Sequence, residues 1–383
     1  MKIIINAARK YIGNNQYKNM FSFIEDRVVS GAAFKILQNK FITAAPSVNK
    51  LTNRQYSDHA NFKFSPLLNT ELHPWWVTGF CDAESCFNIA IFKSTTYKEG
   101  WGVKATFRID LHKKDLDVLK LIQAYFKLEN KGSGNDEEVN RIIIIENRVA
   151  FVVSSIKVLI NIVDHFDRYP LLTQKRKDYL TWRKVVLMLS RKEHLSNEGL
   201  KTIVNLKDSL NMGLSEAIKT AFQLTTKEGN PLGTSLVSGL SEEVSFNSQW
   251  LGGFTSGDGS FMVQLEPNKS KLKKSPRLVF SLTQHSRDEE LMKKLIHYLD
   301  CGGVSKNSKN SSAVKFRVTK FIDICEKIIP LFLRENLIVG IKSKDFADWC
   351  KVAEIMKSKG HLTQEGIDKI ILLKGNMNKA RVN

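Results

Sequence analysis

The sequence predicts an α+β protein made of two similar units, and three features of the chain support this. A ten-residue pattern occurs twice, as WVTGFCDAES at residues 76–85 and as WLGGFTSGDG at residues 250–259. Each copy precedes segments in which apolar and polar residues alternate, as they do in half-buried strands. Helix-like stretches follow these segments in the same order in both units. We therefore interpret the chain as a duplicated domain rather than a stack of short repeats.

The expected elements repeat along the chain. In the first unit we expect strands and one intervening helix, the strands over residues 86–92, 103–112, 141–145 and 148–153 and the helix over 115–126. In the second unit we expect the same kinds of element, with strands over residues 260–265, 277–285 and 313–319 and a helix over 288–299. Three further pairs of segments match between the units: FRIDLH with FSLTQH, KRKDYLTWRKV with KSKDFADWCKV, and HLSNEGL with HLTQEGI.

Composition divides the chain into four parts. Residues 1–72 carry ten Lys and Arg against four acidic residues. We interpret them as a basic, poorly ordered extension, with a mitochondrial targeting segment as the alternative. The two motif-bearing units are expected over residues 73–223 and 248–383. Residues 224–247 are rich in Gly, Ser and Thr, which is typical of a linker.

The net charge indicates a polyanionic partner. The chain has 58 Lys and Arg against 39 Asp and Glu, which gives +19 and a pI near 9.6. Basic residues spread along the whole chain favour an extended nucleic-acid surface. No apolar run approaches the length of about 18 residues that a membrane helix needs, so we expect no membrane partner. The five cysteines are widely spaced without a CxxC pair, which argues against a disulfide framework and a structural zinc site.

The repeated motif predicts a pair of carboxylates. Gly79 and Gly253 occupy the same place in the two copies, although Gly inside a helix costs about 1 kcal/mol relative to Ala. Close packing of the two motif helices would explain both glycines, and it would bring Glu84 and Asp258 together at the helix ends. Such carboxylates repel each other and face the negative ends of the helix dipoles, so a divalent cation would stabilise them. The alternative is two ordinary, solvated acids at helix ends.

The pairing of carboxylates in a basic chain indicates a particular chemistry. Mg²⁺ is usually held by one or two carboxylates together with waters and phosphate oxygens. Paired metal ions can activate water and stabilise the leaving oxygen of a phosphodiester. The recurrence of the acid in the same register favours the metal interpretation over the solvated one.

The alternating strands predict a surface that contacts DNA. Their polar side chains could reach base edges in the major groove, although any half-exposed antiparallel sheet shows the same alternation. A lysine-rich loop at residues 268–276 is expected to bind phosphates. The candidate DNA-binding residues are Asn88, Lys104, Arg108, Gln264, Lys271, Lys273, Lys274, Lys315 and Arg317.

These features resemble the paired LAGLIDADG motifs of single-chain homing endonucleases from fungal mitochondrial introns. The resemblance runs from about residue 73 to residue 383, and the YPLLTQK segment at residues 169–175 contributes to it. It implies two αββαββα units related by a pseudo-twofold axis, with antiparallel sheets forming a saddle over duplex DNA. It also implies an intron-encoded hydrolase, a monomer in the mitochondrion, that cuts both strands at a long asymmetric site and leaves 3′ overhangs.

The resemblance also assigns roles to residues of the candidate site. Glu84 and Asp258 would be the metal-binding acids, holding two or three divalent ions, expected to be Mg²⁺, with the DNA. The basic residues near the scissile phosphates would be Lys175 and Lys342. A polar residue that orients water matches Gln284.

Three differences separate the two copies or depart from the family pattern. Leu111 stands where the second unit has Gln284, which implies that the two strands are not cut by identical pockets. Ser85 replaces the Gly that usually ends the first motif, which predicts a strained but tolerated turn. Ser256 takes the place that Asp82 has in the first copy.

Two alternative functions remain at this point. An RNA-binding maturase that assists group I intron splicing would have intron RNA as its partner, and some members of the resembled family have this activity. A transcription regulator with the same fold would not cut DNA. Acids in both motifs favour the nuclease, because neither alternative requires both of them.

Overall fold

The computed structural model describes most of the two predicted units, over residues 71–126, 140–208, 210, 213–223, 246–267, 274–306 and 312–378. All of these residues belong to one of the chain's two compact units, Leu67–Asn383. The predicted extension and linker lie almost entirely outside the described residues. No helix within the described part of the chain is long and apolar enough to cross a membrane.

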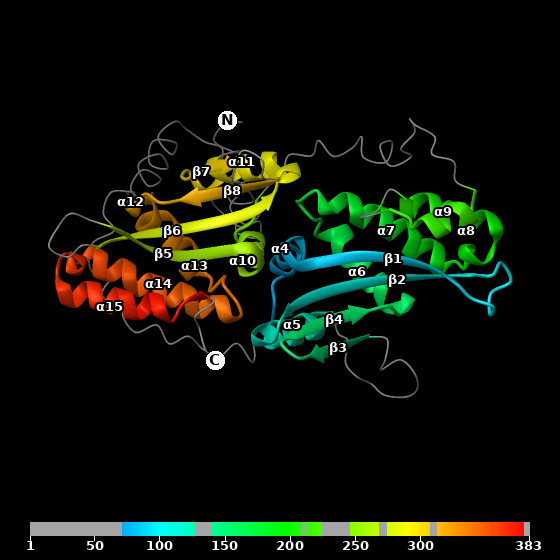
Figure 1. Cartoon of the computed structure of the whole chain (residues 1–383), viewed down its shortest axis with the longest axis horizontal. Helices are drawn as coiled ribbons and strands as arrows, with labels where there is room; N and C mark the ends of the chain where they lie inside the picture. The colour runs from blue at the N-terminus through cyan, green and yellow to red at the C-terminus, as the bar shows by residue number, and fades with distance from the viewer. Residues whose placement is uncertain are drawn as a thin grey trace, which may run out of the picture. The chain divides into compact units, whose positions relative to one another are not determined.

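The first half contains one four-stranded antiparallel sheet in the order β1-β2-β4-β3 (Figure 1). The helices and strands of this half are α4 (Pro74–Glu84), β1 (Ser85–Lys93), β2 (Trp101–His112), α5 (Leu116–Tyr125), β3 (Asn140–Ile145), β4 (Arg148–Val153), α6 (Ile156–Arg168), α7 (Lys175–Ser190), α8 (Asn197–Asp208) and α9 (Glu216–Ala221). Short 3₁₀ turns occur at Lys113–Asp115 and Glu193–Leu195.

The second half repeats this sheet in the order β5-β6-β8-β7. Its elements are α10 (Ser248–Asp258), β5 (Gly259–Pro267), β6 (Lys274–His285), α11 (Glu289–Leu299), β7 (Gly303–Lys306), β8 (Ala313–Val318), α12 (Phe321–Asp323), α13 (Ile329–Arg334), α14 (Ile341–Lys357) and α15 (Gln364–Gly375). A π-helical segment, Ile324–Ile328, joins α12 to α13, and 3₁₀ turns occur at Ser286–Asp288 and Gly360–Leu362. The predicted α+β class and duplication are confirmed.

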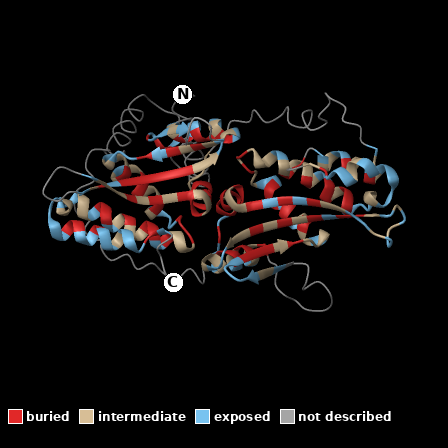
Figure 2. Cartoon of the chain, viewed as in Figure 1, coloured by how far each residue is buried: buried red, intermediate tan, exposed pale blue. Residues whose placement is uncertain are grey.

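Each half has its own aromatic core between the sheet and its helices. Phe87 and Phe107 face each other across β1 and β2, and Phe87 packs 5.1 Å, centroid to centroid, from Trp182 of α7. The second half repeats this arrangement with Phe261, Phe280 and Trp349 of α14. The alternation of buried and exposed residues along β1 and β2 leaves the opposite sheet face available to a partner (Figure 2).

Candidate active site

The two motif helices pack against each other at the junction of the halves. A Cβ atom on Gly79 would lie 2.0 Å from the carbonyl oxygen of Trp250, and one on Gly253 would lie 1.9 Å from the carbonyl oxygen of Trp76. Real Cβ atoms do not approach backbone oxygens so closely, so neither position accommodates a side chain. The two helix backbones are therefore in direct contact.

This contact brings the last residues of the motif helices together. Glu84 ends α4 and Asp258 ends α10. Gly257 directly precedes Asp258 in the chain. The Oε1 atom of Glu84 lies 3.2 Å from the position that a Cβ on Gly257 would occupy, so the Glu84 carboxylate is beside the end of α10. Burial raises the pKa of Glu84. Burial, and then the negative charge of Glu84, raise the pKa of Asp258 to about 7.

A half-buried lysine lies at the end of each motif helix. Lys175, the first residue of α7, donates from Nζ to the carbonyl oxygens of Cys81 at 3.0 Å and Ala83 at 3.2 Å. Lys342 of α14 donates from Nζ to the carbonyl oxygen of Gly257. Burial lowers the pKa of both ammonium groups. Each cation therefore caps the negative end of the motif helix in its own half, beside the paired acids.

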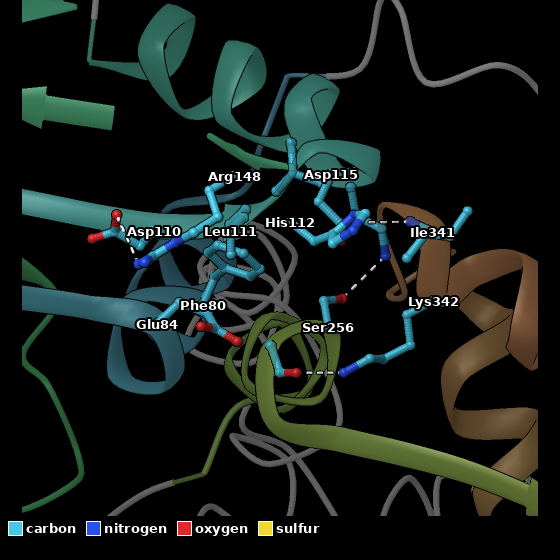
Figure 3. A pocket seen from close by; sticks show the side chains of 13 residues that line it. Phe80, Glu84, Asp110, Leu111, His112, Asp115, Arg148, Ser256, Ile341 and Lys342 are labelled. Atoms are coloured by element: carbon cyan, nitrogen blue, oxygen red, sulfur yellow. Dashed lines mark hydrogen bonds and ion pairs between the residues drawn. The ribbon is translucent and has the colours of Figure 1, made fainter. Parts of the chain in front are cut away.

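The two acids have different neighbours on the long strands. Gln284 of β6 donates a hydrogen bond from Nε2 to Oδ2 of Asp258. The equivalent residue of β2 is Leu111, which has no polar group to offer Glu84. A pocket of about 330 Å³ opens beside Glu84 and is lined from both halves (Figure 3). Its lining includes Leu111, Asp115, Arg148 and Lys342.

The donor set fits a metal site that a nucleic acid would complete. Within the described residues, no group of three or more His, Cys, Asp or Glu side chains could hold a metal ion by itself. Glu84 and Asp258 supply two carboxylates, and burial raises the pKa of both. Carboxylates in such an environment are stabilised by a nearby cation. Phosphate oxygens and waters could supply the remaining ligands that Mg²⁺ requires.

Five of the predicted DNA-contacting residues lie on the sheet face that points away from the core. Asn88 and Lys104 are exposed on β1 and β2, and Arg317 is exposed on β8. Gln264 of β5 and Lys315 of β8 are half-buried. In the first sheet Asn88 and Lys104 come from adjacent strands, whereas in the second sheet β6 separates Gln264 on β5 from Lys315 and Arg317 on β8. Each sheet thus carries an outward-facing patch of polar side chains.

The other four predicted contacts are in different situations. The Nη2 atom of Arg108 donates to Oδ1 of Asp110 at 2.7 Å, so part of its charge is already neutralised within β2. Lys274 is exposed at the start of β6. Lys271 and Lys273 lie outside the described residues.

Asp82, which the sequence comparison of the two motifs noted only because Ser256 replaces it in the second copy, is a buried acid that organises the interface. Both oxygens of Asp82 accept hydrogen bonds, from Thr173 Oγ1 at 2.6 Å and from the indole Nε1 of Trp250, in the other motif helix, at 2.8 Å. In the second motif, Ser256 Oγ accepts from the backbone N–H of Val339 at 3.0 Å. The second motif therefore has a hydroxyl group as its anchor where the first has a carboxyl group.

The predicted strain at Ser85 is wrong. Ser85 has φ −83° and ψ 156°, which is ordinary extended backbone, and Gly259 at the equivalent position is nearly the same. Its Oγ donates to the carbonyl oxygen of Cys81 at 2.7 Å. Serine therefore satisfies one of the last carbonyls of α4 without requiring the conformational freedom of glycine.

The comparisons with known proteins agree with this geometry. The chain belongs to the LAGLIDADG endonuclease family, whose model matches residues 77–186 and 251–353. It is 35% identical over 316 residues to probable intron-encoded endonuclease 3 of Neurospora crassa, covering 82% of this chain and 56% of that protein. It is 34% identical to probable intron-encoded endonuclease 2 of the same fungus, covering 91% of this chain and 75% of that protein. The chain thus spans little more than half the length of the first relative.

Solved structures show the same fold at similar identity. The meganuclease I-SmaMI bound to uncleaveable DNA is 39% identical, with a TM-score of 0.72, and the match covers 82% of this chain and 100% of that one. The LAGLIDADG homing endonuclease I-GzeII in complex with its DNA target is 36% identical, with a TM-score of 0.70, covering 81% and 100%. I-SmaMI bound to an uncleaved DNA target in the presence of calcium ions is also similar, at 39% identity and a TM-score of 0.72, covering 80% and 99%.

Proposed function

We propose that the chain is a site-specific endonuclease that hydrolyses both strands of duplex DNA with divalent metal ions. The observation that carries this proposal is the approach of Glu84 and Asp258 from duplicated halves, each beside a half-buried lysine. The family, and the relatives solved with DNA, support the same reaction. Mg²⁺ is the ion we expect, because two carboxylates leave room for the waters and phosphate oxygens that it prefers.

Each residue of the site would have a separate role in phosphodiester hydrolysis. Bound metal ions would supply an activated water and stabilise the charge on the leaving oxygen. Glu84 and Asp258 would hold these ions, and Gln284 orients the Asp258 carboxylate. The Nζ groups of Lys175 and Lys342 would offset the negative charge of the scissile phosphates.

Duplex DNA is the partner that the sheet surfaces support. The outward-facing patches carry Lys104, Lys315 and Arg317, which suits contacts with phosphates and base edges. We propose that one chain acts alone, since its two halves supply both acids. We also propose the mitochondrion as its location, because the chain resembles enzymes encoded in fungal mitochondrial introns. No observation favours intron RNA as a partner or the maturase alternative.

Selection from a randomised pool of duplex DNA tests the proposed function. The purified protein is incubated with the pool and Mg²⁺, and the ends of cleaved molecules are sequenced. We expect one long, asymmetric target with short 3′ overhangs, and no product when EDTA replaces Mg²⁺. Absence of any cleaved molecules, combined with tight binding to a structured intron RNA, would instead support the maturase.

A further inference from the structure

The helix that carries Lys342 begins against the other half of the molecule. The backbone N–H of Ile341, the first residue of α14, donates to Oδ1 of Asp115 at 3.0 Å. Asp115 lies at the start of α5 in the first half, beside the pocket (Figure 3). The preceding Gly340 has φ 79°, and a Cβ there would lie 2.7 Å from the same carboxylate oxygen. Glycine therefore permits the close approach of Asp115.

The second half makes the reciprocal contact. The backbone N–H of Gln174, directly before Lys175, donates to Oδ1 of Asp288 at 2.6 Å. Asp288 is only 3% exposed. It ends the 3₁₀ turn between β6 and α11, as Asp115 ends the turn between β2 and α5. In both halves the residue just before the lysine is thus held by a carboxylate of the other half.

The segments that lead into these two helices also cross between the halves. Val339, just before α14, is part of the hydrophobic core of the first half. Leu172, just before α7, packs against the hydrophobic core of the second half. Neither helix has a side-chain cap from its own N-cap residue. At α14 the carboxylate of the opposite half accepts the first N–H of the helix. At α7 it accepts the N–H just before the helix, while the N–H of Lys175 donates to Thr173 Oγ1 at 3.3 Å. A carboxylate there also complements the positive end of the helix dipole.

We propose that Asp115 and Asp288 are reciprocal positioning residues for cleavage. Asp115 fixes the helix that places Lys342, and Asp288 fixes the helix that places Lys175. The proposal rests on the nuclease function proposed above and extends it, because it assigns each acid to the cleavage pocket of the opposite half. Each pocket then depends on both halves, which couples the cutting of the two DNA strands to correct assembly of the interface.

Strand-resolved kinetics test this assignment. A duplex target carries a different label on each strand, and Lys175→Met and Lys342→Met first identify the strand that each lysine serves. Asp115→Ala should then slow the strand that Lys342→Met slows, and Asp288→Ala the strand that Lys175→Met slows. We expect the cleavage rate of the affected strand to fall about 10- to 100-fold, which is the effect that small misplacements of reacting groups have. The other strand should be much less affected.

Matched controls separate positioning from general stability. Asp117 and Glu290 hold equivalent places on α5 and α11, and their side chains are 78% and 82% exposed. Asp117→Ala and Glu290→Ala should leave both cleavage rates unchanged. Asp115→Asn and Asp288→Asn keep an oxygen acceptor, so they should cleave at most of the wild-type rate. If an alanine variant unfolds, the cleavage rates of these asparagine variants test the proposal instead. Affinity for the target, measured in EDTA, should stay at the wild-type level in all folded variants.

Three outcomes would overturn the proposal. Asp115→Ala could slow the strand that depends on Lys175, it could slow both strands equally, or it could slow neither. The same outcomes apply to Asp288→Ala with the strands exchanged. Failure of the wild-type protein to cut its selected target would overturn the nuclease function as well, whereas a wrong strand assignment overturns this proposal alone.

Discussion

At the scale of single residues, the site is defined by two half-buried carboxylates, Glu84 and Asp258, at the ends of the packed motif helices. Burial contributes most to the raised pKa of Asp258, and the charge of Glu84 adds to it. The nearby Lys175 and Lys342 lower this pKa without cancelling the other two effects. In the absence of metal, the folded protein therefore retains a proton on Asp258 at a pH where the unfolded chain has lost it.

This proton gives the first prediction. The pKa of Asp258 rises from 3.8 to about 7 on folding, so the folded state binds more protons between these values. The free energy of unfolding of the metal-free protein should therefore fall as pH rises through this window, by up to about 1.4 kcal/mol per pH unit from this group. Below it the contribution is fully present, and above about pH 7 it is lost.

Thermal unfolding in EDTA across pH 4 to 8 measures this effect. Asp258→Asn should show a smaller loss of stability over the same range, and the difference between the two proteins isolates this carboxyl from other titrating groups. Added Mg²⁺ should stabilise the wild type more at pH 8 than at pH 5, because the ligand must be deprotonated. Equal pH slopes in wild type and variant would contradict the proposed environment of Asp258.

The sequence identifies some site residues and not others for physical reasons. Glu84 and Asp258 end a repeated motif, so their pairing could be predicted from the duplication. Asp82, Asp115 and Asp288 accept hydrogen bonds from backbone N–H groups that are 91, 226 and 114 residues away. A backbone N–H has no sequence signature, so only the fold shows what these carboxylates do.

At the scale of elements, the motif helices are the structural basis of the site, and this gives the second prediction. Gly79→Ala would place a methyl carbon 2.0 Å from a carbonyl oxygen of the partner helix, and Gly253→Ala would place one 1.9 Å away. Overpacking of a tight core costs about 1–3 kcal/mol and sometimes more. We expect a loss of about 3 kcal/mol of stability, seen in urea unfolding, together with loss of cleavage as the acids separate.

A glycine at the end of another helix provides the control. A Cβ on Gly375, the last residue of α15, would meet no atom within 4 Å. Gly375→Ala should therefore leave stability unchanged or slightly increase it, since Ala has the higher helix propensity. Equal destabilisation at Gly79 and Gly375 would show that helix packing does not explain the glycines of the motif.

The sheets give the third prediction, which concerns target affinity. Lys315 and Arg317 alternate with buried residues on β8 and point away from the core. Replacing either with Ala should weaken binding, and the salt dependence shows how. Loss of a phosphate contact should lower the salt slope by about 1, whereas loss of a base contact should cost about 1–3 kcal/mol and relax selectivity at one base pair.

Binding isotherms at several salt concentrations measure the salt slope, and isotherms on the selected target and its single-base variants measure the selectivity at each base pair. Lys369 on α15 is also exposed but pairs with Glu365 on the helical side, so Lys369→Ala serves as the control. If Lys315→Ala, Arg317→Ala and Lys369→Ala all bind as the wild type does, β8 is not part of the DNA surface.

The elements also show where sequence patterns are too weak to predict structure. The predicted long strands are present, because many alternating residues mark them. Strand β7, with the sequence GVSK, was not predicted, since four mostly exposed residues carry no apolar period. The π-helical segment Ile324–Ile328 was also not predicted, because its composition is that of an ordinary amphipathic helix.

At the scale of the whole molecule, duplication produces a site that neither half contains alone. Each half supplies one motif acid, one lysine and one aspartate that accepts a hydrogen bond from the other half. These are Glu84, Lys175 and Asp115 in the first half and Asp258, Lys342 and Asp288 in the second. The two copies have nonetheless diverged: Gln284 binds Asp258, whereas Leu111 offers Glu84 no hydrogen bond. Unequal halves in a single chain suit the asymmetric DNA target proposed above, because each half would contact a different part of it. The net charge of +19 suits the same partner.

The most direct measurement compares cleavage and binding of one selected duplex by the wild type, Glu84→Gln and Asp258→Asn in Mg²⁺. We predict that both variants lose double-strand cleavage by about 1,000-fold or more, as expected when several kcal/mol of metal-dependent stabilisation is removed. Both should still bind the duplex as the wild type does. Wild-type cleavage by either variant, or a parallel loss of binding and cleavage, would show that the two acids do not form the metal centre of a nuclease.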